Sequence, residues 1–151
     1  VGSGPFPTEL LDATGEELRQ AGGEFGATTG RPRRCGWLDL VQLRYACRVN
    51  GVTQLAMMKA DVLSGFEEVP VAHSYAHAGG TTQNLPYGIE PDEVTPAYTN
   101  HGGWQEDLTG ITTEAGLPDS IKSYIAMVEK EMATPISIVS VGPDRAQTIV
   151  R

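Results

Sequence analysis

Apolar residues recur with helical spacing in three stretches of the chain. Residues 9–21 (ELLDATGEELRQA) are predicted to be helical, at least from Gly15 onward, and two glycines follow them. Residues 37–50 (WLDLVQLRYACRVN) carry two apolar stripes, which indicates packing partners on two sides of that helix. Residues 117–132 (LPDSIKSYIAMVEKEM) form the third predicted helix, with Pro118 in its first turn and one apolar side.

Shorter apolar runs predict strands. Residues 54–63 (QLAMMKADVL) are typical of a buried parallel strand, and Met57 and Met58 are expected in the core. Residues 66–100 mix β-branched stretches with glycine-rich turns and predict a small antiparallel excursion. Residues 135–151 predict a strand, a Gly-Pro-Asp turn and a second strand. The expected fold class is therefore α/β, with a mostly parallel sheet flanked by helices.

Charge and composition exclude several classes of protein. The 151 residues carry a formal net charge of −8, which argues against a nucleic-acid or membrane-surface binder with a broad basic face. Two cysteines are too few for a disulfide framework, so reduced thiols and a cytoplasmic location are expected. No apolar run approaches the roughly 20 residues that span a bilayer. The opening VGSGPFPTEL resembles neither a signal peptide nor a natural start, so we expect a piece of a longer chain.

A local basic cluster stands out on this acidic chain. Arg31, Arg33 and Arg34 directly follow the Thr-Thr-Gly of residues 28–30. Hydroxyl groups, backbone N–H groups and planar guanidinium forks together match carboxylate or phosphate oxygens. The cluster therefore predicts one anionic ligand. A solvated loop whose arginines pair with nearby acids is the alternative, and composition alone leaves both open.

Polar residues also follow two of the predicted strands. Lys59 and Asp61 come at the carboxyl end of the first strand, the edge at which open α/β sheets bind ligands. A carboxylate there can accept two parallel N–H bonds from a guanine ring, and a lysine stem can lie over the base. Ser140 and Gly142 follow the strand near the C-terminus and can present backbone groups to a planar ligand. A strand-end ion pair and a plain turn are the alternatives.

The three histidines do not predict a metal site. His73 and His77 lie on a predicted strand, where positions four apart are separated by about 13 Å. That separation is too large for the two side chains to share one metal ion. We expect no metal ligands here, and a surface or turn role for these two residues and for His101.

Five blocks together resemble the adenylosuccinate synthetase family, in the family's order. The resemblance covers the chain apart from about residues 66–110. The blocks are VGSGPFPTEL (1–10), GGEFGATTGRPRRCGWLDL (22–40), KADVLSG (59–65), GLPDSIKSYI (116–125) and SVGPDR (140–145). The family often has TKLD where this chain has Met58 to Asp61, but Lys59 and Asp61 remain.

The resemblance implies a ligase of purine (AMP) biosynthesis. The family condenses IMP with L-aspartate at the expense of GTP, giving adenylosuccinate, GDP and phosphate, in a homodimeric enzyme. The family's phosphate loop (GDEGKGK), its catalytic residues and the ligands of its Mg²⁺ are expected in the N-terminal portion, so no catalytic residue is assigned here. Residues 1–151 would then be a single C-terminal fragment of a larger P-loop-like α/β enzyme, without turnover of its own. A standalone GTP/GDP-binding regulatory module and a scaffold for acidic partners are the alternatives.

The resemblance also implies residue roles. Residues 22–36, named here the arginine loop, would close over aspartate, and residues 59–61 and 140–142, named here the two strand ends, would bind guanine. Arg34 would orient the loop. The implied aspartate and IMP contacts are Val1, Thr28, Thr29, Gly30, Arg31 and Arg33. The implied GTP contacts are Arg33, Lys59, Ala60, Asp61, Ser140, Val141 and Gly142.

Overall fold

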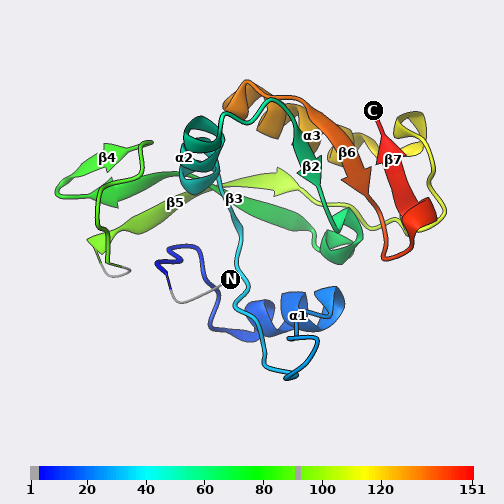
Figure 1. Cartoon of the computed structure of the whole chain (residues 1–151), viewed down its shortest axis with the longest axis horizontal. Coiled ribbons are helices and arrows are strands. Elements are labelled where there is room, and N and C mark those ends of the chain that lie inside the picture. Colours follow the sequence, from blue (N-terminus) through cyan, green and yellow to red (C-terminus); the bar gives the residue numbers. More distant parts are fainter. Residues whose placement is uncertain (1–3, 91–92) are drawn as a thin grey trace. The chain divides into compact units, whose positions relative to one another are not determined.

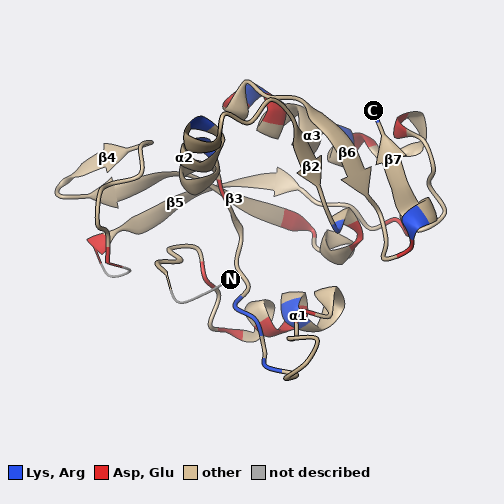
Figure 2. Ribbon diagram, in the orientation of Figure 1, with Lys and Arg blue, Asp and Glu red and all other residues tan. Residues whose placement is uncertain are grey.

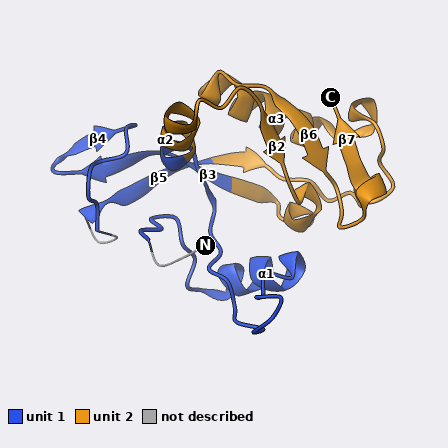
Figure 3. Cartoon of the chain, viewed as in Figure 1, with its two compact units in different colours: residues 1–42, 70–99 blue, residues 43–69, 100–151 orange. Residues whose placement is uncertain are grey.

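The computed structural model describes residues 4–90 and 93–151. The chain divides into two compact units, residues 1–42 with 70–99 and residues 43–69 with 100–151 (Figure 3). Seven strands and three α-helices are described in them (Figure 1). No helix within the described residues combines the length and apolarity that crossing a membrane requires.

The first sheet is built around one long strand. Its strands are β1 (Leu38–Asp39), β3 (Glu68–His77), β4 (Gly80–Thr82) and β5 (Thr95–Gly102). Strand β3 pairs with β1 in parallel and with β4 in antiparallel orientation, and β5 also pairs with β3. Ala78 and Gly79 join β3 to β4 with positive φ angles at both residues, as a tight hairpin turn requires.

The second sheet consists of β2 (Leu55–Met57), β6 (Ile136–Ser140) and β7 (Thr148–Val150). Strand β6 lies between the other two, parallel to β2 and antiparallel to β7. The predicted parallel strand is thus confirmed, but the prediction that Met57 and Met58 lie in the core is wrong. Met58 is 60% exposed and Met57 is only half-buried, because β2 is a short edge strand.

Two sheets of mixed orientation correct the expected architecture. The prediction of one mostly parallel sheet is wrong, because each sheet contains both a parallel and an antiparallel pair. The segment 66–100 is not a small excursion either. It contains β3, the longest strand, which has buried residues on both of its faces and supplies the centre of the first sheet.

Three α-helices begin and end with local signals. They are α1 (Ala13–Gly22), α2 (Leu40–Asn50) and α3 (Asp119–Met132). The Asp12 side chain accepts a hydrogen bond from the backbone N–H of Gly15 at the start of α1, and Gly23 ends that helix at φ 58°. Pro118 is the N-cap of α3 and lies before its first turn, one residue earlier than predicted.

Helix α2 begins three residues later than predicted. The Asp39 carboxylate accepts hydrogen bonds from the N–H groups of Val41 and Gln42, which caps the helix there. Its two predicted stripes are buried only near the start: Val41 is 1% exposed, whereas Tyr45 and Val49 are 50% and 60% exposed. Burial on both stripes is therefore confined to the first turn, where Leu40 of one stripe and Val41 of the other are buried.

Each unit has its own buried residues. In the first unit, Val41, Tyr75, Ile89 and Val94 form a core cluster with Leu85 packed against it. In the second, the predicted apolar side of α3 is buried, together with Tyr124. The other buried residues on that side are Ile121, Ile125, Val128 and Met132.

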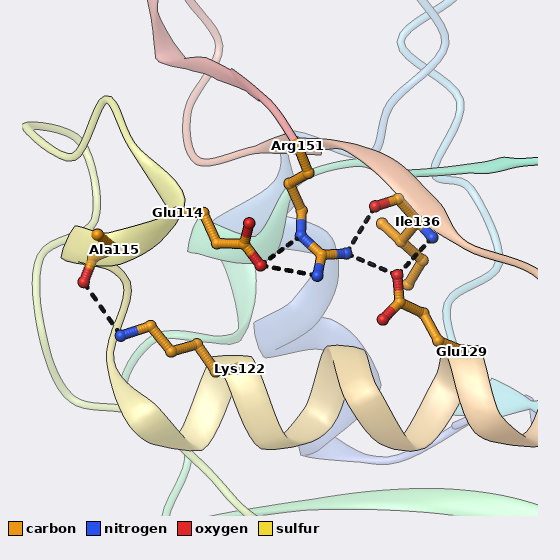
Figure 4. A network of polar contacts seen from close by, with 6 residues as sticks. All are labelled: Glu114, Ala115, Lys122, Glu129, Ile136 and Arg151. Atoms are coloured by element: carbon orange, nitrogen blue, oxygen red, sulfur yellow. Dashed lines mark hydrogen bonds and ion pairs between the residues drawn. The ribbon is translucent and has the colours of Figure 1, made fainter.

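A network of ion pairs joins the last residue to the second unit (Figure 4). The Arg151 guanidinium contacts the carboxylates of Glu114 and Glu129 at 2.7 Å and donates to the carbonyl oxygen of Ile136 at 2.6 Å. Glu129 also accepts a hydrogen bond from the Ile136 N–H at 2.7 Å. The network therefore links α3 with the start of β6.

Candidate functional site

The two strand ends emerge at the same edge of the second sheet. Strands β2 and β6 are parallel neighbours, so residues 59–61 and 140–142 leave the sheet in the same direction. Residues Ala60–Leu63 form a 3₁₀ turn, η1, which contacts β6. The structure thus brings together the two segments predicted to bind guanine.

At this edge of the sheet, one carboxylate oxygen of Asp61 is buried. That oxygen, Oδ1, has no hydrogen-bond partner within the described residues. A buried carboxylate oxygen without a donor is costly, and native proteins rarely leave one unpaired. Donors from a bound molecule, such as the two adjacent N–H groups of guanine, would remove that cost.

Lys59 adopts a backbone conformation that side-chain-bearing residues seldom adopt. Its φ angle is 59°, in the left-handed region, and it precedes η1 directly. Such conformations store strain and occur often at functional sites. Here the conformation turns the chain sharply after β2, so that η1 and Asp61 follow at the sheet edge.

The second strand end is held by its own hydrogen bonds. The buried Ser140 hydroxyl donates to the carbonyl oxygen of Gly142 at 3.0 Å, and the N–H of Val141 donates to the carbonyl oxygen of Gln147 at 2.9 Å. A β-carbon at Gly142 would overlap the Gln147 side-chain amide. Glycine at this position therefore permits a close approach that fixes the shape of the turn.

Gln147 was not identified from the sequence. It closes a capping box with Asp144 around the 3₁₀ turn η4 (Arg145–Gln147), and its amide also donates to the carbonyl oxygen of Thr109 at 3.2 Å. The Asp-x-x-Gln spacing is the signal that could have indicated it.

The arginine loop is an exposed hairpin in the first unit. The backbone N–H of Gly26 donates to the carbonyl oxygen of Arg31, and the N–H of Arg33 donates to that of Glu24, both at 2.9 Å. Gly30 closes the tip at φ 64°, where a side chain would be strained. Figure 2 shows the basic residues of this loop following α1.

The three arginines of the loop have different surroundings. Arg33 pairs with Glu24 at 2.8 Å, and Arg34 pairs with Glu9 at 2.6 Å. The pair with Glu9 raises the pKa of Arg34, whose guanidinium also lies 5.2 Å from the centre of the Phe6 ring. The Arg31 guanidinium is exposed and forms no hydrogen bond or ion pair with the described residues. The alternative of arginines paired with acids therefore applies to two of the three.

Two further expectations concern Val1 and the binding of a metal ion. Val1, an implied IMP contact, lies outside the described residues. Residues 4–90 and 93–151 contain no group of three or more His, Cys, Asp and Glu side chains arranged to hold a metal ion.

Comparison with known proteins places the chain in a family. The family model for adenylosuccinate synthetase matches residues 1–149. The chain belongs to the adenylosuccinate synthetase family. The adenylosuccinate synthetase of Flavobacterium johnsoniae is 59% identical over all of this chain, and that of Trichlorobacter lovleyi is 52% identical over 99% of it. A structure of fully ligated adenylosuccinate synthetase from Plasmodium falciparum is 40% identical, with a TM-score of 0.91 over the whole chain.

The match covers all of this chain but little of its relatives. The chain spans 36% of the length of the Flavobacterium johnsoniae adenylosuccinate synthetase and 37% of the Plasmodium falciparum chain. The mixed α/β fold is therefore that of part of an adenylosuccinate synthetase. Its placement in the C-terminal portion of a P-loop-like enzyme stays a prediction.

Proposed function

We propose that this chain supplies the guanine pocket and the aspartate-binding loop of a GTP-dependent ligase that forms adenylosuccinate from IMP and L-aspartate. The full-length protein would release GDP and phosphate. It would contribute its phosphate loop, catalytic residues and Mg²⁺ ligands from the portion N-terminal to this chain. A homodimer in the cytoplasm is the expected setting for the full-length protein.

This proposal rests chiefly on the buried Oδ1 of Asp61, which has no hydrogen-bond partner in the part of the chain that the structure describes. Guanine offers two adjacent N–H groups on one edge, and a carboxylate can accept both. The parallel strand end at residues 140–142 gives a second wall of backbone groups at the same sheet edge. Hypoxanthine lacks the exocyclic amine and would leave part of the carboxylate unpaired, so the site favours guanine.

The arginine loop supports the amino-acid half of the proposal. The exposed Arg31 guanidinium, which has no partner among the described residues, and the hydroxyl groups of Thr28 and Thr29 are donors suited to a small dicarboxylate. Arg33, paired with Glu24, would exchange or share that partner when it reaches a ligand. In this scheme Arg31 also touches IMP and Arg33 also reaches GTP.

Phosphoryl transfer depends mainly on positioning and on stabilisation of charge. This chain's own residues would orient the guanine base and hold the aspartate carboxylates, so that the amine can reach position 6 of the phosphorylated IMP. Mg²⁺, when bound by the rest of the protein, neutralises phosphate charge. The residues described here would therefore decide which substrates bind and where.

A coupled assay of the full-length protein tests the proposal. We expect adenylosuccinate to form only when GTP, IMP and aspartate are all present, and none to form with the 151-residue chain alone. Nucleotide binding by the full-length protein without any product would favour the regulatory module instead. Turnover by the 151 residues alone would contradict the division of roles.

A further inference from the structure

Trp104 supports the turn that carries Asp61. Its indole Nε1 donates a hydrogen bond to the carbonyl oxygen of Ala60 at 3.0 Å. Both residues are 1% exposed, so this bond is shielded from water. Ala60 directly precedes Asp61 in η1, and the indole therefore fixes the peptide from which the Asp61 side chain extends.

The backbone around Trp104 holds the other end of the same turn. The N–H of Gly65 donates to the carbonyl oxygen of Trp104 at 2.8 Å, and Ser64 forms a parallel bridge with Trp104. The N–H of Gly103 donates to the carbonyl oxygen of Glu67 at 2.9 Å. Residues 103–104 thus bind the chain on the far side of η1, while the indole binds its start.

The position of the indole is itself fixed. The Trp104 ring meets the ring of Tyr124 edge-on, with centroids 5.7 Å apart, and Tyr124 belongs to α3. A β-carbon at Gly103 would overlap the carbonyl group of Phe66, so the segment before Trp104 also lies close against the residues after η1. The support under Asp61 is therefore a packed, hydrogen-bonded unit.

We propose that Trp104 is a positioning residue for guanine recognition, acting through Ala60 on the orientation of Asp61. The inference rests on the proposed function of the two strand ends. A carboxylate that accepts two parallel N–H bonds needs a fixed orientation, because hydrogen bonds weaken steeply with misalignment. Loss of the indole donor would leave the Ala60 carbonyl buried and unpaired, and the turn would relax toward other conformations.

Two variants of the full-length protein test this role. Replacing Trp104 with β-(3-benzothienyl)alanine keeps two fused rings but removes the N–H group, and Trp104→Phe also removes volume. We expect either change to raise the KM for GTP by roughly three- to tenfold, as for a lost buried hydrogen bond. The preference for GTP over ITP in kcat/KM should fall by a similar factor. The KM values for IMP and aspartate and the kcat with saturating GTP should change by less than about twofold.

Tyr124→Phe is the matched control. It removes a polar atom from the aromatic side chain beside Trp104 but leaves the bond to Ala60 intact, so the KM for GTP should stay within about twofold. A purely structural Trp104 would lower the melting temperature in its variants and leave the KM for GTP and the GTP/ITP preference unchanged, which would overturn the inference. If Trp104→Phe does not fold, the benzothienyl variant, which keeps the shape, decides.

Asp61→Asn, measured in parallel, separates the two proposals. If Asp61→Asn leaves GTP binding unchanged, the guanine site itself is wrongly assigned. If Asp61→Asn weakens GTP binding and the benzothienyl variant does not, the guanine site stands and only the role of Trp104 is wrong.

Discussion

Arg33 forms an ion pair with Glu24 at 2.8 Å across the base of the arginine loop. Two residues earlier, Arg31 forms none within the described residues, although both are exposed. Of these two guanidinium groups, that of Arg33 is thus held by the protein, and that of Arg31 has no partner among the described residues. Because only Arg33 is paired, we expect its removal to affect both stability and aspartate binding, and the removal of Arg31 to affect aspartate binding alone.

Arg31→Ala should impair aspartate binding without affecting stability. A charge-assisted hydrogen bond contributes about 1.5–3 kcal/mol, so the KM for aspartate should rise roughly 10- to 100-fold. Steady-state kinetics of the full-length protein and its melting temperature measure the two effects. Arg33→Ala should raise the same KM and also lose an exposed ion pair of at most about 1 kcal/mol.

Arg44→Ala is the control for both loop variants. Arg44 pairs with Glu131 at 3.1 Å and lies on α2, away from the loop sequence. Its removal should leave the KM for aspartate within about twofold. Equal loss of aspartate binding in Arg44→Ala and Arg31→Ala would contradict a specific role for the loop.

Two buried tyrosines should make the protein sensitive to alkali. Burial, and then the hydrogen bond that the hydroxyl donates to Asp39, raises the pKa of Tyr75 well above its usual value. Burial alone raises the pKa of Tyr124. Because the folded-state pKa values are raised, the contribution to stability is complete below the unfolded-state pKa of about 10 and is lost as the pH rises above it.

Urea unfolding between pH 8 and 11 measures this sensitivity. The free energy of unfolding should fall above about pH 10, by up to about 1.4 kcal/mol per pH unit for each tyrosine. Tyr75→Phe with Tyr124→Phe should be less stable at pH 8 and show a shallower decline. An equally steep decline in the double variant would mean that other groups are responsible.

The Arg151 network should contribute to stability above acidic pH. Burial raises the pKa of Glu129, but the hydrogen bond from Arg151 and that from the Ile136 N–H outweigh it, so the pKa lies below its usual value. A lowered pKa means that the stabilisation is present above the unfolded-state pKa of about 4.3 and is lost as the pH falls through the folded-state value.

Glu129→Gln tests this network. The variant should be less stable than the wild type at pH 7 by about 1–2 kcal/mol, and the difference should shrink as the pH falls below about 4. Thermal unfolding across that range gives both quantities. A stability difference that does not change with pH would show that the charge of Glu129 is irrelevant.

Gly142→Ala should disturb the second strand end. The added methyl group would meet the Gln147 amide, which two hydrogen bonds hold in place. Displacing that side chain should weaken GTP binding several-fold. Adding Gln147→Ser to Gly142→Ala should partly restore GTP binding, because the shorter side chain leaves space for the methyl group. Gly110→Ala, where a β-carbon meets open space, is the matched control and should bind GTP like the wild type. Wild-type affinity in Gly142→Ala would contradict a fixed turn.

Local signals in the sequence were sufficient for much of the fold. The glycine after α1, the Asn-Gly pair at the end of α2 and the apolar run of β6 determine the conformation of neighbouring residues, so these elements could be predicted. Strand β1 could not, because Leu38 continues the apolar pattern of α2, and Leu38 and Asp39 become a strand only by pairing with β3, about thirty positions away.

The candidate site divides in the same way. The residue types at Lys59 and Asp61 and their position after a strand were readable from the sequence. The hydrogen bond between Trp104 and Ala60 joins residues 44 positions apart. That Asp61 Oδ1 is buried without a partner among residues 4–90 and 93–151 depends on what surrounds it after folding. Sequence spacing carries no information on either, because both depend on tertiary packing.

Calorimetric titration of the full-length protein with GTP and with IMP, wild type against Asp61→Asn, is the decisive measurement. Replacing one carboxylate oxygen with an amide puts a donor where guanine also donates, so GTP affinity should fall roughly 10- to 100-fold, about 1–3 kcal/mol. IMP affinity should change by less than about twofold, and Asp119→Asn, whose side chain is fully exposed, should bind both nucleotides like the wild type. Undiminished GTP affinity in Asp61→Asn would contradict the account.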